Sequence, residues 1–191
     1  MFIKMKVSSL AFVLIAATSI SSAKNYQGVI EDIIESDSRN QGVEVTLESK
    51  RNDLWFCVKS LEDFVGPMDV FRVFLQSAGR LKEESFDSVK LCYGNAEKFS
   101  LPGTQYSVMG KQLETQNIMY TIRTFPKKLA LPTGSPAFEK HRGGVLYEMK
   151  WQMRDFKSMN EQWYLVDVIE AREAKKDAMR PKTFAPDEEV F

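Results

Sequence analysis

The chain has 191 residues and carries 26 basic and 26 acidic side chains, so its net charge is zero at pH 7 when the single histidine is neutral. Such a balance excludes the strongly basic surface that nucleic-acid binding requires, and it provides no broad basic face for an anionic membrane. We therefore expect no nucleic-acid partner.

Residues 1–23 have the three-part pattern of a secretory signal peptide. Lys4 and Lys6 precede an apolar run over residues 10–20, and small residues lead up to Ala23. The run is too short for a membrane-spanning helix, and signal peptidase cleaves after small residues. The pattern predicts cleavage after Ala23, a periplasmic or secreted location and no integral membrane span after processing. A retained membrane anchor is the less favoured alternative.

The first elements after this segment are expected to be a weak helix and a β-hairpin. The helix is predicted within residues 24–40 because Val29, Ile30 and Ile33 have helical spacing. Residues 43–47 alternate between apolar and polar, residues 50–53 have turn chemistry, and residues 54–58 supply the partner strand.

An amphipathic helix and a second hairpin follow. Five apolar side chains recur at three- and four-residue steps and predict a buried helix face beginning near Pro67, namely Phe71, Phe74, Leu75, Ala78 and Leu81. Residues 88–93 and 96–101 alternate with a period of two. A two-residue loop would pair Tyr93 with Ala96. A three-residue loop would pair Leu91 with Phe99, and this register is favoured because it sets apolar side chains opposite each other.

The order strand, strand, helix, strand, strand predicts the fold class. It is typical of an α+β fold with a largely antiparallel sheet of two hairpins, with room for a further strand, and with amphipathic helices packed on one face. Residues 24–179 are sufficient for a single globular α+β domain, and the charged residues 180–191 indicate a flexible C-terminal tail.

Cys57 and Cys92 are the two cysteines, and each falls on a predicted strand. Export would take them to an oxidising compartment, where a disulfide is favoured over two free thiols. Closing a loop of this length would stabilise the fold by about 3.8 kcal/mol in the chain-entropy model. The single His141 lies far along the chain, so we expect no metal site.

The C-terminal half contains the longest irregular segment. Residues 104–114 are expected to form a helix, whereas residues 116–125 fit both a strand and a helix. Residues 126–144 hold three prolines and three glycines and predict a long loop, which is where a functional site is often found. A strong helix begins at Val145, and it is expected to break or bend near residues 165–169, which could instead form a last strand.

One side of this last helix is apolar and is expected to belong to the core, with an exposed groove for a partner as the alternative. The predicted stripe consists of Val145, Leu146, Met149, Met153, Phe156, Asn160, Trp163 and Tyr164.

Two groups of residues are candidates for ligand binding. His141, Arg142, Gly143 and Gly144 stand at the start of a helix, where free backbone N–H groups and the helix dipole favour an anion. The alternative is a plain solvated loop.

The second group consists of Gln116, Asn117 and Arg123 around an apolar segment. Polar side chains in such a place either cap neighbouring turns or line a pocket.

No arrangement of catalytic residues is recognisable, so catalytic residues stay unassigned and no cofactor is expected. A Ser–His or Cys–His site would have to use His141, and no nucleophile motif accompanies it. We therefore expect an exported, non-enzymatic protein that acts through a protein partner or a small ligand. The alternative is a hydrolase with an acidic site assembled by the fold, because carboxylates far apart in sequence can be brought together.

The signal pattern makes a direct prediction about processing. Mass spectrometry of the exported protein should find Lys24 at the N-terminus, because cleavage is expected after Ala23. Membrane-bound material that retains Met1 would contradict this prediction.

Overall fold

The computed structural model describes residues 23–180. The predicted signal peptide, apart from Ala23, and the predicted tail, apart from Arg180, lie outside the described residues. Within the described part of the chain, no helix has both the length and the apolar character needed to cross a bilayer.

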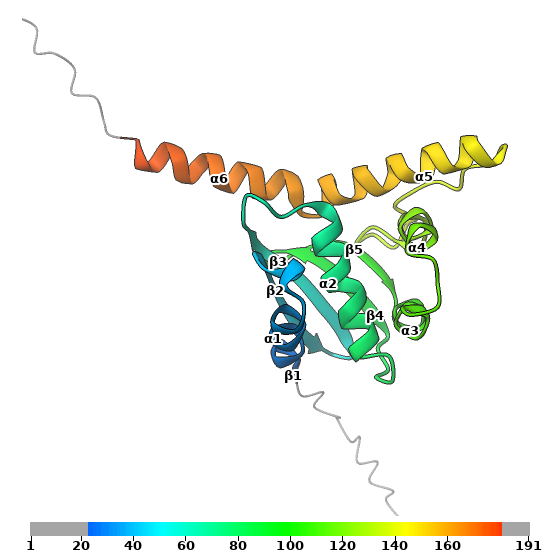
Figure 1. Ribbon diagram of the computed structural model, residues 1–191, viewed down its shortest axis with the longest axis horizontal. Helices are drawn as coiled ribbons and strands as arrows, with labels where there is room; N and C mark the ends of the chain where they lie inside the picture. Colours follow the sequence, from blue (N-terminus) through cyan, green and yellow to red (C-terminus); the bar gives the residue numbers. More distant parts are fainter. Residues whose placement is uncertain (1–22, 181–191) are drawn as a thin grey trace, which may run out of the picture.

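Five strands form one sheet in the order β1-β2-β3-β4-β5 (Figure 1). The strands are β1 (Lys24–Asn25), β2 (Val43–Lys50), β3 (Asp53–Leu61), β4 (Ser88–Tyr93) and β5 (Ala96–Pro102). Both predicted hairpins are confirmed, because β2 pairs with β3 and β4 pairs with β5 in antiparallel orientation. The α+β class is confirmed as well.

The prediction of a largely antiparallel sheet needs correction, because the sheet is mixed. β3 and β4 lie side by side and run parallel. The helix α2 (Pro67–Arg80) connects them, and a crossover helix returns the chain to the end of the sheet at which β3 began. The two hairpins are therefore joined by a β-α-β unit.

The second hairpin combines features of both predicted registers. Leu91 pairs with Phe99 as favoured, yet the loop is the two-residue alternative, because Tyr93 pairs with Ala96. A β-bulge between Leu91 and Cys92 absorbs the difference of one residue. The register prediction is confirmed, and the predicted loop length is wrong.

The parallel pairing sets Cys57 of β3 directly beside Cys92 of β4, and the two form a disulfide. Their Cα atoms are 4.4 Å apart. Both side chains are buried, so the bond lies within the sheet and joins the two hairpins covalently.

The core lies between the sheet and the helices in front of it in Figure 1. On β3 the side chains of Leu54, Phe56 and Val58 are fully buried. The ring of Phe74 from α2 meets that of Phe56 edge to face at 5.3 Å. The weak helix predicted in residues 24–40 is α1 (Gln27–Ser36), and its buried side chains join the same core.

Two helices follow the sheet in sequence. α3 (Gly103–Gln112) packs so closely on α2 that a Cβ atom at Gly110 would lie 2.0 Å from the Ala78 carbonyl oxygen, so glycine is required there. The ambiguous segment 116–125 is a helix, α4 (Ile118–Thr124), and the strand alternative is wrong. Helical spacing prevails because it directs Ile122 and Phe125 together into the core.

The last helical run bends where it crosses the sheet (Figure 1). α5 (Val145–Asn160) continues through a π-helical turn (Glu161–Leu165) into α6 (Val166–Met179). The predicted bend is confirmed, although it lies a few residues earlier than expected, and residues 166–169 are helical instead of forming a strand. A π-turn inserts one extra residue into the helix and changes its direction.

Trp163 anchors this bend to the sheet. Its side chain is fully buried, and its ring lies 5.8 Å from Phe56 and 6.2 Å from Phe74. Its Nε1–H donates a 3.1 Å hydrogen bond to the carbonyl oxygen of Cys92, next to the β-bulge. Both α5 and α6 are therefore held at their junction.

Replacing this indole should destabilise the protein. We expect Trp163→Phe to lower the free energy of unfolding by about 1–3 kcal/mol, because the buried Cys92 carbonyl loses its donor, and by a further amount for lost packing. Urea unfolding midpoints measure the change. Trp55→Phe is the matched control, since Trp55 is only partly buried, and we expect a change of less than about 1 kcal/mol there. Equal losses in both variants would contradict the anchoring role.

Candidate functional site

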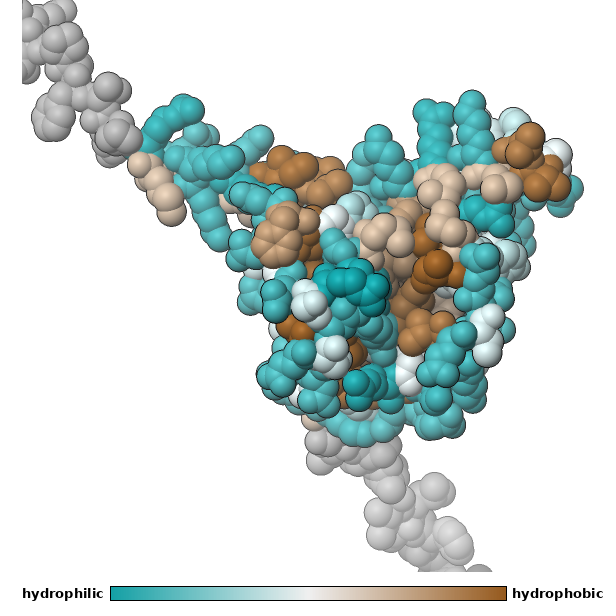
Figure 2. Space-filling view, viewed as in Figure 1, coloured by the Kyte–Doolittle hydropathy of each residue, from teal (hydrophilic) through white to brown (hydrophobic). Residues whose placement is uncertain are grey.

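The N-terminal half of α5 and the short helix α4 expose an unusual number of large apolar side chains. The most exposed are Leu146 at 82 % and Val145 at 75 %. The others are Ile118, Met119, Tyr120, Tyr147, Met149 and Met153. Figure 2 shows this apolar surface along the lower side of α5 and at its N-terminal end.

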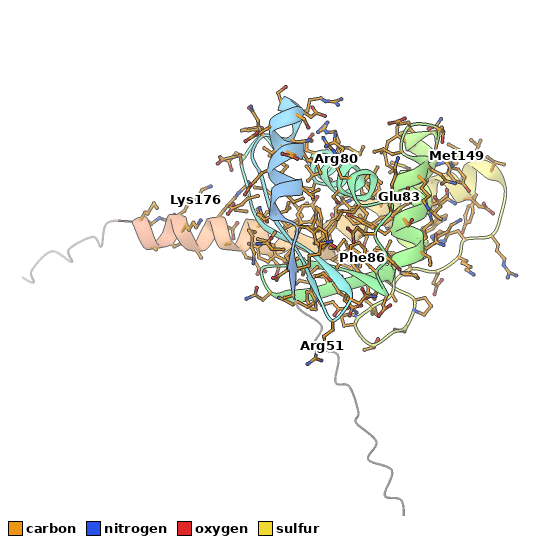
Figure 3. All side chains as sticks on the ribbon, turned by 90° about the horizontal axis from the view of Figure 1, so that it is seen from below. Arg51, Arg80, Glu83, Phe86, Met149 and Lys176 are labelled. Atoms are coloured by element: carbon orange, nitrogen blue, oxygen red, sulfur yellow. A yellow bond between two sulfur atoms is a disulfide. The ribbon has the colours of Figure 1, made fainter. Side chains whose placement is uncertain are left out.

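Part of this surface is hollowed between the two helices. The hollow, which we call the methionine groove, has a volume of about 760 Å³. It is lined by Gln116, Asn117, Met119, Tyr120, Arg123, Met149 and Met153. Met149 lies at the α4–α5 end of the molecule, far from Lys176 on α6 (Figure 3).

The expected burial of the α5 stripe is therefore only half right. From Phe156 onward the stripe is buried, and Phe156 meets the ring of Phe71 on α2 at 5.2 Å. From Val145 to Met153 it is exposed, because α5 runs outward beyond the edge of the sheet (Figure 1). The alternative of an exposed groove describes this outer half.

A second hollow adjoins the groove on an adjacent side of α5. It has a volume of about 660 Å³, and we call it the basic pocket. Its lining consists of Pro102, Gln105, Arg123, Lys127, Lys128, Glu139, Lys140, His141, Arg142, Glu148, Gln152 and Asp155. Histidine aside, five cationic side chains and three carboxylates meet here.

Two of the three carboxylates already have partners. Asp155 lies 2.6 Å from His141 Nε2, and the imidazole ring also stacks on Trp151 with ring centres 5.5 Å apart. Glu148 accepts a 3.2 Å hydrogen bond from the backbone N–H of Gly143. These contacts fasten the end of the 126–144 loop to α5.

The first predicted ligand group is split by the fold. His141 and Arg142 line the basic pocket, whereas Gly143 and Gly144 are not among its lining residues. The Gly143 N–H, which a bound anion would use, is paired with the Glu148 carboxylate. Ligand binding by these four residues stays a prediction.

The second predicted group lies together in the methionine groove. Gln116, Asn117 and Arg123 all line it. Asn117 also caps α4, since its side-chain oxygen accepts a 2.8 Å hydrogen bond from the Met119 N–H. All three residues therefore line the pocket, and Asn117 caps a helix as well.

Arg123 links the two hollows, because it lines both. Its Nε–H is buried and has no hydrogen-bond partner among the residues that the structure describes. Beside it, burial lowers the pKa of Lys128, and the charge of neighbouring Lys127 lowers it further. The cations here are crowded and poorly compensated.

The loop that brings these cations together is well packed. Ala130 forms a bridge with Ser100 of β5, with backbone hydrogen bonds of 2.8 and 2.9 Å. Phe138 packs its ring 5.8 Å from that of Phe99. The loop thus covers the β5 edge and holds Lys127 and Lys128 against α5.

Sequence reasoning missed several residues that line these hollows. They are Lys127, Lys128, Lys140, Glu139, Glu148, Met119 and Tyr120. The Lys127-Lys128 pair was a visible local signal. Its convergence with Arg123 and Arg142 was not visible, because that depends on the path of the loop.

The described residues contain no cluster of three or more His, Cys, Asp or Glu side chains arranged to hold a metal ion. Comparisons of the chain with protein-family models, with curated proteins and with solved structures find no match. Function therefore has to be inferred from the chemistry of this surface.

The two halves of α5 should respond differently to truncation. We expect Phe156→Ala to cost about 3–5 kcal/mol because it opens a cavity in the core. Met153→Ala, three residues away and 39 % exposed, should cost less than about 1 kcal/mol. Urea midpoints measure both. A loss for Met153→Ala as large as that for Phe156→Ala would show that the groove is part of the core.

Proposed function

We propose that this protein is exported and acts by binding a polypeptide partner through the methionine groove, without catalysis. The observation that carries the proposal is the exposed apolar half of α5. Its other half is buried on the sheet, so the helix is firmly held while its outer turns lack a cover among the described residues.

An exposed surface of this kind fits a binding role on physical grounds. Contiguous apolar patches on folded proteins commonly mark interaction sites. Methionine side chains are flexible and polarisable and adapt to varied apolar partners. Met119, Met149 and Met153 line the groove together, which favours a surface that accommodates side chains of different shape.

The extent of the surface favours a polypeptide over a small ligand. From Val145 to Met153 the exposed stripe follows α5 for eight residue steps, or about 12 Å, and α4 widens it. Val145 and Leu146 lie outside the lining of the groove. A small molecule in the groove would leave them in water, whereas a peptide segment could cover them.

Three observations support export. Residues 1–23 have a signal-peptide pattern, and β1 starts at Lys24, immediately after the expected cleavage position. The buried Cys57–Cys92 disulfide is typical of proteins that fold in an oxidising compartment.

A hydrolase is less well supported. The carboxylates of Asp155 and Glu148 are engaged by His141 and by the Gly143 N–H. The lining of the basic pocket includes no Ser, Thr or Cys that His141 could activate.

Selection from a random peptide display library tests the binding role. The oxidised protein, immobilised, should enrich peptides that carry apolar side chains. Met149→Glu should reduce recovery at least about tenfold, because it places a charge in the apolar groove. Ile169→Glu is the matched control, since Ile169 is 44 % exposed on α6, away from the groove. Recovery that is unchanged by Met149→Glu would overturn the proposal.

A further inference from the structure

The methionine groove and the basic pocket form one surface with two chemical halves. Met149 and Met153 of α5 face the groove, whereas Glu148, Gln152 and Asp155 face the pocket. The two hollows therefore lie on adjacent sides of one helix, no farther apart than the helix diameter of about 10 Å. Arg123 lies beneath both.

The cations of the pocket have no ion-pair partner among the described residues, although carboxylates line the same pocket. Within residues 23–180, none of the five forms an ion pair or a side-chain hydrogen bond, namely Arg123, Lys127, Lys128, Lys140 and Arg142. Elsewhere, partly buried cations like Arg123 and Lys128 are paired, as in Lys90 with Glu97 and Lys98 with Asp167, both at 3.0 Å.

The environment of these cations favours an incoming negative charge. Lys128 is partly buried beside Lys127, and Arg123 keeps a buried Nε–H without a partner in the described structure. Guanidinium groups bind carboxylates through two parallel hydrogen bonds. A carboxylate entering the pocket would relieve the repulsion between the lysines and satisfy the arginine.

We propose that the partner segment is both apolar and acidic, with apolar side chains in the methionine groove and carboxylates in the basic pocket. Arg123 is then the residue that the two halves share. This inference rests on the proposed function and adds the chemistry of the partner. A separation of about 10 Å corresponds to roughly three residues of extended chain, so the acidic residues should follow or precede the apolar ones closely.

The same geometry disfavours a polyphosphate or nucleic acid. Glu139, Glu148 and Asp155 line the pocket among the cations, and they would repel a dense row of phosphates. The adjoining groove is lined by Met and Tyr side chains with no obvious use in binding a phosphate backbone. Carboxylates spaced along an apolar peptide match both halves.

The test is the composition of peptides selected from the same random display library. The wild-type protein should enrich Asp and Glu within about three residues of the apolar positions. The double variant Lys127→Gln with Lys128→Gln should retain apolar enrichment and lose acidic enrichment, because both lysines line the pocket and not the groove. Arg123→Gln should lose acidic enrichment as well. Lys150→Gln is the matched control, because Lys150 is exposed on α5 and lines neither hollow.

A selected peptide, synthesised and labelled, gives the affinity. Replacing its acidic residues by Gln should weaken binding to the wild-type protein about tenfold, and added salt should weaken binding of the acidic form. The variants that lack pocket cations should discriminate between the two peptides by less than about twofold. Urea midpoints close to the wild-type value confirm that these variants fold.

The outcomes separate this inference from the proposed function. Apolar enrichment without acidic enrichment, or acidic enrichment that survives the pocket variants, would overturn the acidic partner and leave the binding groove standing. No enrichment that depends on Met149 would overturn both. Sedimentation that shows self-association abolished by Met149→Glu would also overturn the acidic partner, because the occupant would be a second copy of the chain.

Discussion

The position of α5 depends on the indole of Trp163. This side chain fills the space beside Phe56 and Phe74 and donates a hydrogen bond to the Cys92 carbonyl. That carbonyl lies beside the β-bulge, where the regular β4–β5 pairing is interrupted and a backbone group needs another partner. One residue thus satisfies the sheet irregularity and fixes the helix that carries the exposed surface.

The parallel pairing of β3 and β4 is the second constraint. It places Cys57 beside Cys92 and lets a disulfide join the two hairpins at the centre of the sheet. The same strand pair supports Trp163 through Phe56 and the Cys92 carbonyl. The strand pair that carries the disulfide therefore also supports the inner end of α5. This support holds the helix in place although its apolar outer turns have no cover among the described residues.

The loop 126–144 supplies the electrostatic half of the surface. Just before its start, the ring of Phe125 packs on that of Phe71, with ring centres 5.0 Å apart. Its end is tied to α5 by the contact between His141 and Asp155. The histidine, the most obvious candidate for chemistry in the sequence, holds the loop in place. Lys128 and Arg142, which form no ion pair within residues 23–180, line the same pocket as this histidine.

The local elements could be predicted from the sequence: the period-two pattern defined both hairpins, and the helical spacing defined α2. These features depend on contacts between neighbours in sequence or across one turn. The cysteines on predicted strands indicated a disulfide, but its formation across 35 residues depends on the parallel pairing of β3 and β4. The remaining features depend on tertiary contacts. Residues 116–125 fit both periods, and only burial of Ile122 and Phe125 made them helical. The parallel pairing of β3 and β4 depends on how α2 crosses between them. An apolar stripe on α5 shows which face is apolar but not whether anything covers it, and the meeting of Arg123, Lys127 and Arg142 depends on how a loop of nineteen residues folds back across the sheet edge.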